Sequence, residues 1–503
     1  MKLGEIMRKI KKVTPYLFLI FVFITVIFSF RANPFSNVLS GHDSSMFLYF
    51  GKGISDGLIP YKDMLDHKGP ILFIIQYLAV LAGFGNFSLG IWLIECLFFL
   101  GTLFFLYKTC YLCINDKLIS AVSVTFLTPL FILCYDGGNY SEEFALLFIS
   151  ISLYFFCKIF FKRRVSRVEY LLIGFLGAAT FFIRLNMISL WVVFCLFLVY
   201  INLKDKNKKL LFQQVKYIFL GGITLTILII AISLFQNNLE EMFYQAFIMN
   251  ISYSNSNLSE KINTAFAFIE LLLKSGVFSL VVIFFVSILQ KRVGQKNRFY
   301  FVLCIYFVVN FVTVVLSGRY YTHYLVTQFA PLVIMIAFAL QFIVSTIAGR
   351  KRNLLAVIIL LTMIIPITIS SVRTYNFGFN LKPSLDTEQT KIISEYINKN
   401  SKKSDTIYVH NINANIYLLS DRYSNSRYFV LPSINYDNFP SMKKEFVRNL
   451  YFNRPKFIVV RKQLLSDGST SSNLNNEVLK ALKNYDQIIT VKSDNYLLFK
   501  DNH

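Results

Sequence analysis

The chain has 503 residues, of which 55% are hydrophobic, 17% aromatic and only 16% charged. Soluble domains carry about 25% charged residues, so the composition excludes an ordinary soluble protein. The remaining charge is strongly basic, with 51 Lys and Arg against 28 Asp and Glu and a formal net charge of +23. Such a charge raises nucleic acid as a partner until the positions of the basic residues are considered.

The first apolar segment, Thr14–Phe30, follows five basic residues and has no small-residue cleavage site after it. We therefore predict an uncleaved membrane span rather than a signal peptide. Many later apolar segments also have the length that a helix needs to cross about 30 Å of hydrocarbon. Eleven spans are predicted, at approximately 15–31, 88–107, 117–135, 142–161, 169–184, 186–203, 213–235, 271–290, 299–316, 324–347 and 353–372. The sequence thus predicts a polytopic α-helical membrane protein with a transmembrane domain over residues 1–373.

Basic residues gather in six clusters between the predicted spans. The clusters are Lys2–Lys12, Lys108–Lys117, Lys158–Arg167, Lys204–Lys216, Lys291–Arg298 and Arg350–Arg352. They hold 24 Lys and Arg with three acidic residues, and so carry +21 of the net charge. Because basic residues collect in short cytoplasmic loops, we place all six inside. An odd number of spans then puts the N-terminus in the cytoplasm and the C-terminal region outside.

The first outer loop, residues 32–69, carries an acidic residue at the start of an amphipathic segment. His42 and Asp43 precede Ser44–Ile54, which we predict to be a helix along the membrane surface. Asp43 is then either a cap of that helix or a catalytic carboxylate, and the residues alone do not decide between the two.

A second polar group, Asp66-His67-Lys68-Gly69-Pro70, ends this loop at a predicted chain reversal. Lys68 would lie at the depth of lipid phosphates, where it either binds a substrate phosphate or anchors the chain to lipid. The apolar stretch Ile71–Ala82 is too short to cross the bilayer, so we predict an interfacial or re-entrant helix.

A third polar group, Asp136-Gly-Gly-Asn-Tyr-Ser-Glu142-Glu143, lies between the third and fourth spans. Its glycines predict a tight turn. Glu142 and Glu143 either complement the dipole of the next helix or belong to an active site.

Cationic residues occupy two later outer turns. Arg319 and His323 lie between the ninth and tenth spans, near hydrocarbon, where ionisable groups need partners. A guanidinium suits bidentate phosphate binding, and the adjacent Tyr320 could help to orient a headgroup. Arg184, in another turn with Asn186, is either a further phosphate ligand or an interfacial anchor.

Residues 374–503 are polar and contain no long apolar run. A helix is predicted at Glu388–Asn400, and strands are predicted at Thr406–Val409, Phe457–Val460, Ile488–Val491 and Tyr496–Phe499. We therefore predict a small extracytoplasmic, soluble mixed α/β domain. It either covers an active site and helps to bind an acceptor, or it is a passive lid.

In their order along the chain, these motifs resemble the GT-C superfamily of integral membrane glycosyltransferases. The resemblance is to bacterial relatives of protein O-mannosyltransferases and of lipid A aminoarabinose transferases, and it covers most of the chain. It rests on Asp43 in GHDSSMFLY, Tyr61-Lys62-Asp63, Asp66-His67-Lys68-Gly69-Pro70, Asn139-Tyr-Ser-Glu142-Glu143, Gly318-Arg319-Tyr320 with His323-Tyr324, Asp405-Thr-Ile-Tyr408-Val and Ile416-Tyr417-Leu-Leu-Ser-Asp421-Arg. The resemblance implies a GT-C-like fold and a glycosyltransferase activity.

In that family the donor is a sugar on a polyprenyl phosphate, which agrees with the lack of nucleotide sugars outside the membrane. The resemblance assigns the first-loop acid, Asp43, as the general base of an inverting transfer. The cationic residues would bind the donor phosphate; they are Lys68, Arg319, His323 and Arg184. Further residues would bind the acceptor or support the site; they are His42, Tyr61, Asp66, His67, Glu142, Glu143 and Tyr320. The acceptor would be a cell-surface glycan, a glycolipid or a protein.

Two other functions stay open from the sequence. A transporter or flippase of a lipid-linked glycan needs ionisable residues midway through its spans or paired broken helices, whereas the polar residues here lie mostly at outer ends. A ligase or polymerase that uses a polyprenyl diphosphate glycan differs mainly in the donor headgroup. No Gly-rich phosphate loop or His-rich cluster stands in a suitable context, so no cofactor is predicted and a divalent metal stays open. We expect a multi-pass protein of a bacterial cell membrane, with lipid and no nucleic acid as a partner.

Overall fold

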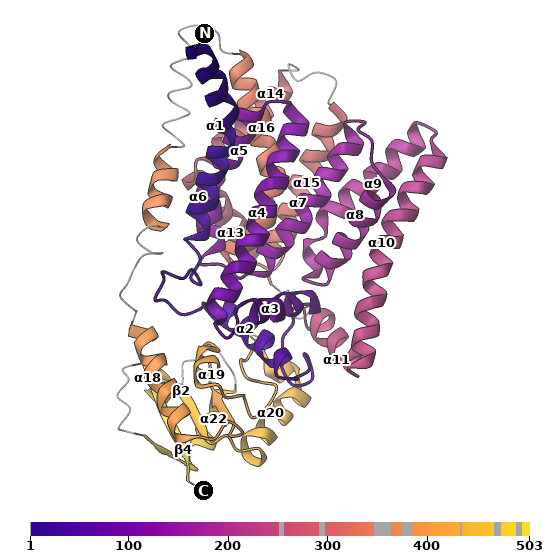
Figure 1. The fold of residues 1–503 in the computed structure, drawn as a ribbon. Helices are drawn as coiled ribbons and strands as arrows, with labels where there is room; N and C mark the ends of the chain where they lie inside the picture. The colour runs from indigo at the N-terminus through magenta and orange to yellow at the C-terminus, as the bar shows by residue number, and fades with distance from the viewer. Residues whose placement is uncertain are drawn as a thin grey trace. The chain divides into compact units, whose positions relative to one another are not determined.

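The computed structural model describes residues 2–250, 256–290, 297–346, 364–374, 385–432, 435–466, 474–488 and 495–502 (Figure 1). The chain divides into two compact units. Unit 1 comprises residues 1–33, 94–231 and 254–379, and unit 2 comprises residues 34–93, 232–253 and 380–503. Unit 1 is helical, whereas unit 2 combines helices with a small sheet.

Unit 1 is a bundle of helices, most of them apolar (Figure 1). Its helical elements are α1 (Lys2–Ile27), most of α4 (Phe87–Ile114), α5 (Lys117–Thr125), α6 (Thr128–Tyr135), α7 (Ser141–Phe160), α8 (Arg167–Phe181), η1 (Leu185–Met187), α9 (Ser189–Lys204), most of α10 (Lys208–Phe235), α13 (Leu258–Lys274), α14 (Val277–Leu289), α15 (Asn297–Val315), η3 (Thr322–Gln328) and α16 (Phe329–Thr346). Residues 364–374 are also helical.

Within the described ranges, six helices are long and apolar enough to cross a membrane. The number rises to seven if α13 and α14, which meet at an angle of 94°, form one broken span. The predicted polytopic α-helical membrane fold is thus confirmed. The eleven spans stay a prediction, since several helices are shorter and residues 353–363 of the last predicted span lie outside the described residues.

Glycines bring the backbones of α8 and α10 close together. A Cβ atom at Gly174 would lie 1.8 Å from the carbonyl oxygen of Ile218, and one at Gly221 would lie 1.9 Å from that of Leu171. Small residues allow such approach between membrane helices, where burial away from water supplies little driving force. These contacts attach α10 to the bundle.

A buried polar group connects the start of α9, α15 and the end of η3. Asn310 accepts a hydrogen bond from Ser189 Oγ at 2.5 Å and donates one to Gln328 Oε1 at 2.5 Å. Buried polar groups of this kind need partners, so the network fixes η3 against its neighbours. The same element η3 carries His323.

Unit 2 begins with two packed helices, α2 (His42–Ser55) and α3 (Pro70–Ala82). The rings of Phe50 and Phe73 stack at 3.9 Å between centroids. A Cβ atom at Gly51 would lie 2.5 Å from the carbonyl oxygen of Gln76, so a glycine allows this close approach. The short helix α3 matches the one predicted at Ile71–Ala82, and its position at a membrane interface stays a prediction.

The C-terminal part of unit 2 contains a four-stranded mixed sheet of order β1-β2-β4-β3. Its strands are β1 (Ile407–Val409), β2 (Phe457–Arg461), β3 (Tyr485–Gln487) and β4 (Tyr496–Asp501). β1 is parallel to β2, whereas β4 is antiparallel to both β2 and β3. Three of the predicted strands are confirmed. The fourth, expected at Ile488–Val491, differs: β3 ends at Gln487, and residues 489–491 lie outside the described residues.

Helices complete this part of unit 2. They are α18 (Leu385–Asn400), α19 (Asn415–Ser420), η4 (Tyr436–Asn438), α20 (Pro440–Phe452), α21 (Gln463–Ser466) and α22 (Asn475–Leu482). Ile458 and Val460 of β2 pack in one core with Phe446 and Val478 from α20 and α22. The alternate residue Phe457 contacts Tyr396 of α18. Both faces of β2 are therefore covered, which explains its continuous apolar sequence.

Candidate functional site

The end of the first loop in unit 2 folds back on itself between Pro60 and Lys68. Tyr61 has a positive φ of 69° and donates its backbone N–H to the Met64 carbonyl at 2.8 Å. Its phenol donates to the Lys68 carbonyl at 2.8 Å. Tyr61 is 1% exposed, so the predicted site residue supports the loop rather than facing solvent.

This loop holds three predicted site residues in one group, Asp66, His67 and Lys68. The Lys68 backbone N–H donates to Asp66 Oδ1 at 2.9 Å, and Asp66 Oδ1 lies 3.5 Å from His67 Nδ1. The Lys68 ammonium lies 3.1 Å from His67 Nε2. Asp66 and Lys68 are only 2% and 8% exposed. A carboxylate, an imidazole and an ammonium thus lie in direct contact.

Electrostatics connect Asp43 to this group. Burial raises the pKa of the Asp66 carboxyl above its usual value, and the negative charge of Asp43 adds to the increase. The positive charge of Lys68 and hydrogen bonding from its backbone N–H oppose the increase. Asp43 therefore lies close enough for its charge to act on the buried carboxyl.

Asp43 lies in the first turn of α2, where a helix dipole favours an acid. The N-cap residue is Gly41, and His42 is the first helical residue. The predicted helix is confirmed. Its N-cap is Gly41, two positions before Asp43, so Asp43 is not the cap. Asp43 is half-buried and His42 is exposed.

Three amide side chains that sequence analysis missed hold this loop. Gln245 donates to the Tyr61 carbonyl at 2.7 Å and accepts the Asp66 backbone N–H at 3.3 Å. Asn238 donates to the Pro60 carbonyl at 2.9 Å, and Asn250 donates to the His67 carbonyl at 2.7 Å. They come from α11 (Leu239–Phe243), the π-helical turn η2 (Tyr244–Ile248) and their flanks. Nothing in the local sequence marks these amides, although π-helical turns are frequent at functional sites.

An open cavity of about 450 Å³ lies beside one of these amides, Gln245. The described residues that line it are Glu240, Glu241, Phe243, Tyr244, Gln245, Ile248 and Arg427. Gln245 thus lines the cavity and also holds Asp66. Carboxylates beside exposed aromatic rings are groups that hydrogen-bond hydroxyls and pack against a polar ligand.

Lys52 forms a second charged group in unit 2 that was not predicted. Its ammonium lies 2.8 Å from Asp56 Oδ2, 2.8 Å from Asp421 Oδ1 and 2.9 Å from the Tyr423 phenol. Burial alone would raise the pKa values of Asp56 and Asp421. Hydrogen bonds and positive charge from Lys52, with contributions from Lys403 at both residues and from Tyr423 at Asp56, lower both pKa values below the usual carboxyl value. The group connects α2 to the segment after α19.

Unit 1 holds the remaining predicted residues. The Arg184 guanidinium lies 2.5 Å from Glu142 Oε1, and both side chains are buried. Ser141 Oγ donates to the other Glu142 oxygen at 2.9 Å. The guanidinium also lies over the Tyr324 ring, 4.3 Å from its centroid. Arg184 and Glu142 were predicted in separate turns, and the fold brings them together.

Glu143 takes part in the turn that precedes α7. Its carboxylate accepts the Asn139 backbone N–H at 2.9 Å. A Cβ atom at Gly138, which has a positive φ of 90°, would lie 2.1 Å from Oε1 of Glu95. Glu95 on α4 is completely buried and was missed, although an ionisable residue inside a predicted span is a functional signal by itself.

His323 stacks on Tyr140, with 4.1 Å between ring centroids. Arg319 is half-buried in the turn before η3, and its backbone N–H donates to Ser317 Oγ at 3.4 Å. The Tyr320 ring contacts Phe268 at 5.1 Å between centroids. His323 also contacts Tyr324, the ring that lies beneath the Arg184 guanidinium. Glu142, Arg184 and His323 are therefore brought to one set of neighbours.

The predicted site residues are divided between the two units. Unit 2 contains His42, Asp43, Tyr61, Asp66, His67 and Lys68, and unit 1 contains Glu142, Glu143, Arg184, Arg319, Tyr320 and His323. Among the residues that the structure describes, no three His, Cys, Asp or Glu side chains are arranged to hold a metal ion.

A family model described as "Putative competence-induced protein Ccs4 N-terminal domain" matches residues 5–377, and a Ccs4 C-terminal domain model matches residues 387–501. No curated protein matches. The apo crystal structure of ArnT from Cupriavidus metallidurans is similar, with a TM-score of 0.62 at 10% identity over 96% of this chain and 97% of that chain.

The structure of ArnT from Cupriavidus metallidurans bound to undecaprenyl phosphate is also similar. Its TM-score is 0.59 at 12% identity over 96% of this chain and 97% of that chain. At these identities the similarity establishes the fold. The GT-C-like fold that the sequence resemblance implies is thus confirmed.

Proposed function

Because the chain belongs to the family described as "Putative competence-induced protein Ccs4" and has a GT-C-like fold, we propose that it is a membrane glycosyltransferase with a polyprenyl-phosphate sugar as donor. One observation carries the proposal. The fold similarity extends over 96% of the chain to a protein solved with undecaprenyl phosphate. Asp43, Asp66, His67 and Lys68 are proposed to supply the basic carboxylate and the cation that such a transfer needs.

In the proposed reaction, Asp43 is the general base. Its carboxylate takes the proton from an acceptor hydroxyl, and the acceptor oxygen attacks the anomeric carbon of the donor. The bond from that carbon to the phosphate oxygen breaks, and the polyprenyl phosphate leaves as an anion. A single direct displacement inverts the anomeric centre.

The leaving group needs positive charge more than a general acid. We propose that Lys68 binds the donor phosphate, held in place by His67 and the Asp66 carboxylate. Arg184, Arg319 and His323 are proposed as further phosphate ligands. The proposed acceptor or supporting residues are His42, Tyr61, Asp66, His67, Glu142, Glu143 and Tyr320.

The acceptor is proposed to be an outer-surface glycan, glycolipid or protein. The basic clusters support a cytoplasmic N-terminus, so the transfer would take place at the outer face of a bacterial cell membrane. In this proposal residues 1–373 are the catalytic transmembrane domain, and residues 374–503 are an extracytoplasmic α/β domain.

The test uses the purified full-length chain with a radiolabelled polyprenyl-phosphate sugar. We expect Asp43→Asn to remove detectable turnover while the monodisperse protein and its melting temperature persist. Asp486→Asn is the matched control, because Asp486 is an exposed acid of β3 outside the proposed site, and it should retain activity. Full activity of Asp43→Asn would contradict the assignment of the base.

The same preparation distinguishes other functions. Movement of the labelled lipid across vesicles without an acceptor, and with no sugar released, would identify a flippase instead. Turnover only with a polyprenyl-diphosphate glycan would identify a ligase or polymerase. Either result overturns the proposed donor chemistry.

A further inference from the structure

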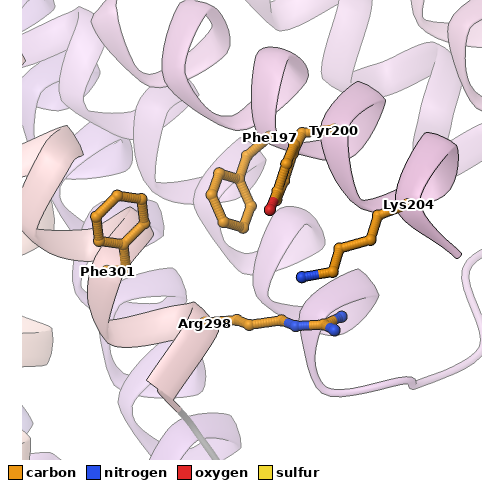
Figure 2. A pocket seen from close by; sticks show the side chains of 5 residues that line it. All are labelled: Phe197, Tyr200, Lys204, Arg298 and Phe301. Atoms are coloured by element: carbon orange, nitrogen blue, oxygen red, sulfur yellow. The ribbon is translucent and has the colours of Figure 1, made fainter.

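A cavity of about 370 Å³ lies between α9 and α15 of unit 1. Figure 2 shows its described lining residues: Phe197, Tyr200 and Lys204 extend from α9, and Arg298 and Phe301 extend from α15. The two helices pack against each other. All five side chains are aromatic or basic, so the described lining combines flat apolar walls with two positive charges.

We propose that this cavity binds the phosphate of an anionic membrane phospholipid. Lys204 lies in the last turn of α9, and Arg298 lies in the first turn of α15. A phosphate placed between them would meet a cation from each helix, and it would also meet the positive end of the α15 dipole. Basic pockets between membrane helices are known sites for anionic lipid headgroups.

The aromatic walls are held by packing. Phe197 stacks on Phe160 of α7 with 5.8 Å between centroids, and it contacts Tyr200 and Phe301 at 5.6 Å and 6.1 Å. The Tyr200 ring also faces the Lys204 ammonium at 5.8 Å. Phe197 and its partners therefore form the floor of the cavity before any ligand binds.

The cations are accessible for a ligand. Arg298 lies 3.7 Å from Asp205, but both side chains are more than half exposed, so this ion pair is weak and exchangeable. The Asp205 carboxylate, at 3.7 Å, is too far away to accept a hydrogen bond from the Arg298 guanidinium. A phosphodiester in the cavity can accept two such hydrogen bonds.

Exposed apolar side chains favour a lipid over a soluble phosphate. On α9, Leu196 and Val192 precede Tyr200 at intervals of four residues and are 66% and 45% exposed. On α15, Val308 and Val312 follow Phe301 and are 56% and 53% exposed. These residues continue the faces of Tyr200 and Phe301 along the two helices. They offer an apolar surface for acyl chains next to the headgroup cavity.

The position agrees with the predicted topology. Lys204 and Arg298 belong to two of the basic clusters that we place in the cytoplasm. The cytoplasmic leaflet is where anionic lipids are enriched, and Tyr200 is a residue type that lies at the headgroup level. The inference does not depend on the proposed transferase activity.

The test measures lipid binding to the full-length protein by native mass spectrometry, with dioleoyl phosphatidylglycerol and dioleoyl phosphatidylcholine as probes. We expect saturable binding of phosphatidylglycerol and little of phosphatidylcholine. The double variant Lys204→Gln/Arg298→Gln should weaken phosphatidylglycerol binding about 25-fold, roughly five-fold for each cation.

The matched control is Lys208→Gln/Lys209→Gln, which removes the same charge from exposed lysines outside the described lining of the cavity. It should leave binding within about two-fold. An equal loss of phosphatidylglycerol binding in both double variants would contradict binding in the cavity. It would show instead a general attraction of the lipid to a basic face of the protein. If glycerol 3-phosphate at equal phosphate concentration displaces phosphatidylglycerol, the cavity binds a soluble phosphate compound. That result would overturn the proposal that its ligand is a lipid. The single variant Arg298→Lys keeps the positive charge but loses the bidentate hydrogen bonds of the guanidinium. We expect it to remain monodisperse and to bind phosphatidylglycerol with an affinity between those of the wild type and the double variant, which a misfolded protein would not do.

Discussion

The guanidinium of Arg184 and the carboxylate of Glu142 meet inside unit 1, with 2.5 Å between Nη1 and Oε1. Their side chains are only 8% and 3% exposed. Two residues that the sequence offers as separate functional candidates are therefore partners. Arg184 has five N–H donors, so this contact is compatible with the proposed phosphate ligand.

Removal of one member of this pair should be costly. Glu142→Gln leaves the Arg184 charge buried beside a neutral amide, and we expect a loss of about 3–5 kcal/mol. The double variant Glu142→Gln/Arg184→Gln should recover much of the loss, because no buried charge remains. Thermal unfolding in detergent measures both. The exposed pair Glu270–Lys274 is the control, and Glu270→Gln should change stability by less than about 1 kcal/mol. Equal effects at the two pairs would contradict the prediction.

Gln245 should act on turnover through the loop that it holds. Gln245→Met keeps the length of the side chain and removes the hydrogen bonds to Tyr61 and Asp66. If the proposed transfer is correct, kcat should fall by about 10–100-fold, because small displacements of reacting groups are costly. The KM for the donor should change little. The exposed Gln290→Met serves as the control. A change in KM alone would show that Gln245 binds substrate instead.

Gly51 should not tolerate a methyl group. Gly51→Ala places Cβ 2.5 Å from the Gln76 carbonyl oxygen, which is fixed backbone of α3. We expect destabilisation of about 1–3 kcal/mol from overpacking. Gly222→Ala is the matched helical control, because its nearest neighbour is an ordinary contact at 3.5 Å. Removing a helical glycine there should be neutral or stabilising by up to about 1 kcal/mol. Similar melting temperatures for the two variants would refute the close approach of α2 and α3.

His410 should make unit 2 sensitive to mild acid. It hydrogen-bonds Tyr408 at 2.9 Å and Asn475 at 2.8 Å, and burial lowers its pKa from 6.5 to about 4. Below pH 6.5 the unfolded chain binds a proton that the folded chain does not bind until about pH 4. Stability should therefore fall by roughly 3 kcal/mol across this interval. His410→Gln should flatten the melting temperature between pH 6.5 and 4. An unchanged slope in that variant would assign the pH dependence to other groups.

The Lys52 group should have its own response to acid. Asp56 and Asp421 have lowered pKa values, so their contribution is present above the usual carboxyl pKa and is lost as the pH falls below it. Lys52→Met removes the shared cation, and we expect a lower melting temperature at pH 7 and a smaller further decrease toward pH 3. The exposed Lys62→Met is the control. An identical acid profile in Lys52→Met would show that the cation does not set these pKa values.

Much of the fold follows from local patterns in the sequence. Apolar runs predict the membrane helices, since hydrocarbon requires continuous apolar length and internal hydrogen bonding. Short apolar segments bounded by turn residues predict β1, β2 and β4, and α18 follows from its helical periodicity. The motif order also indicates the GT-C fold, which the solved structures confirm.

The sequence by itself therefore determined the membrane class, most of the membrane helices, the mixed α/β character of the C-terminal part and the list of polar candidates. Only the tertiary structure decided which of these candidates meet. Arg184 is 42 residues from Glu142, and Gln245 is 179 residues from the Asp66 backbone N–H that it accepts. Lys52 likewise forms an ion pair with Asp421, which lies far from it along the chain. Hydropathy and turn propensity act over a few residues, whereas a buried charge or amide takes its partner from whichever segment packing places beside it.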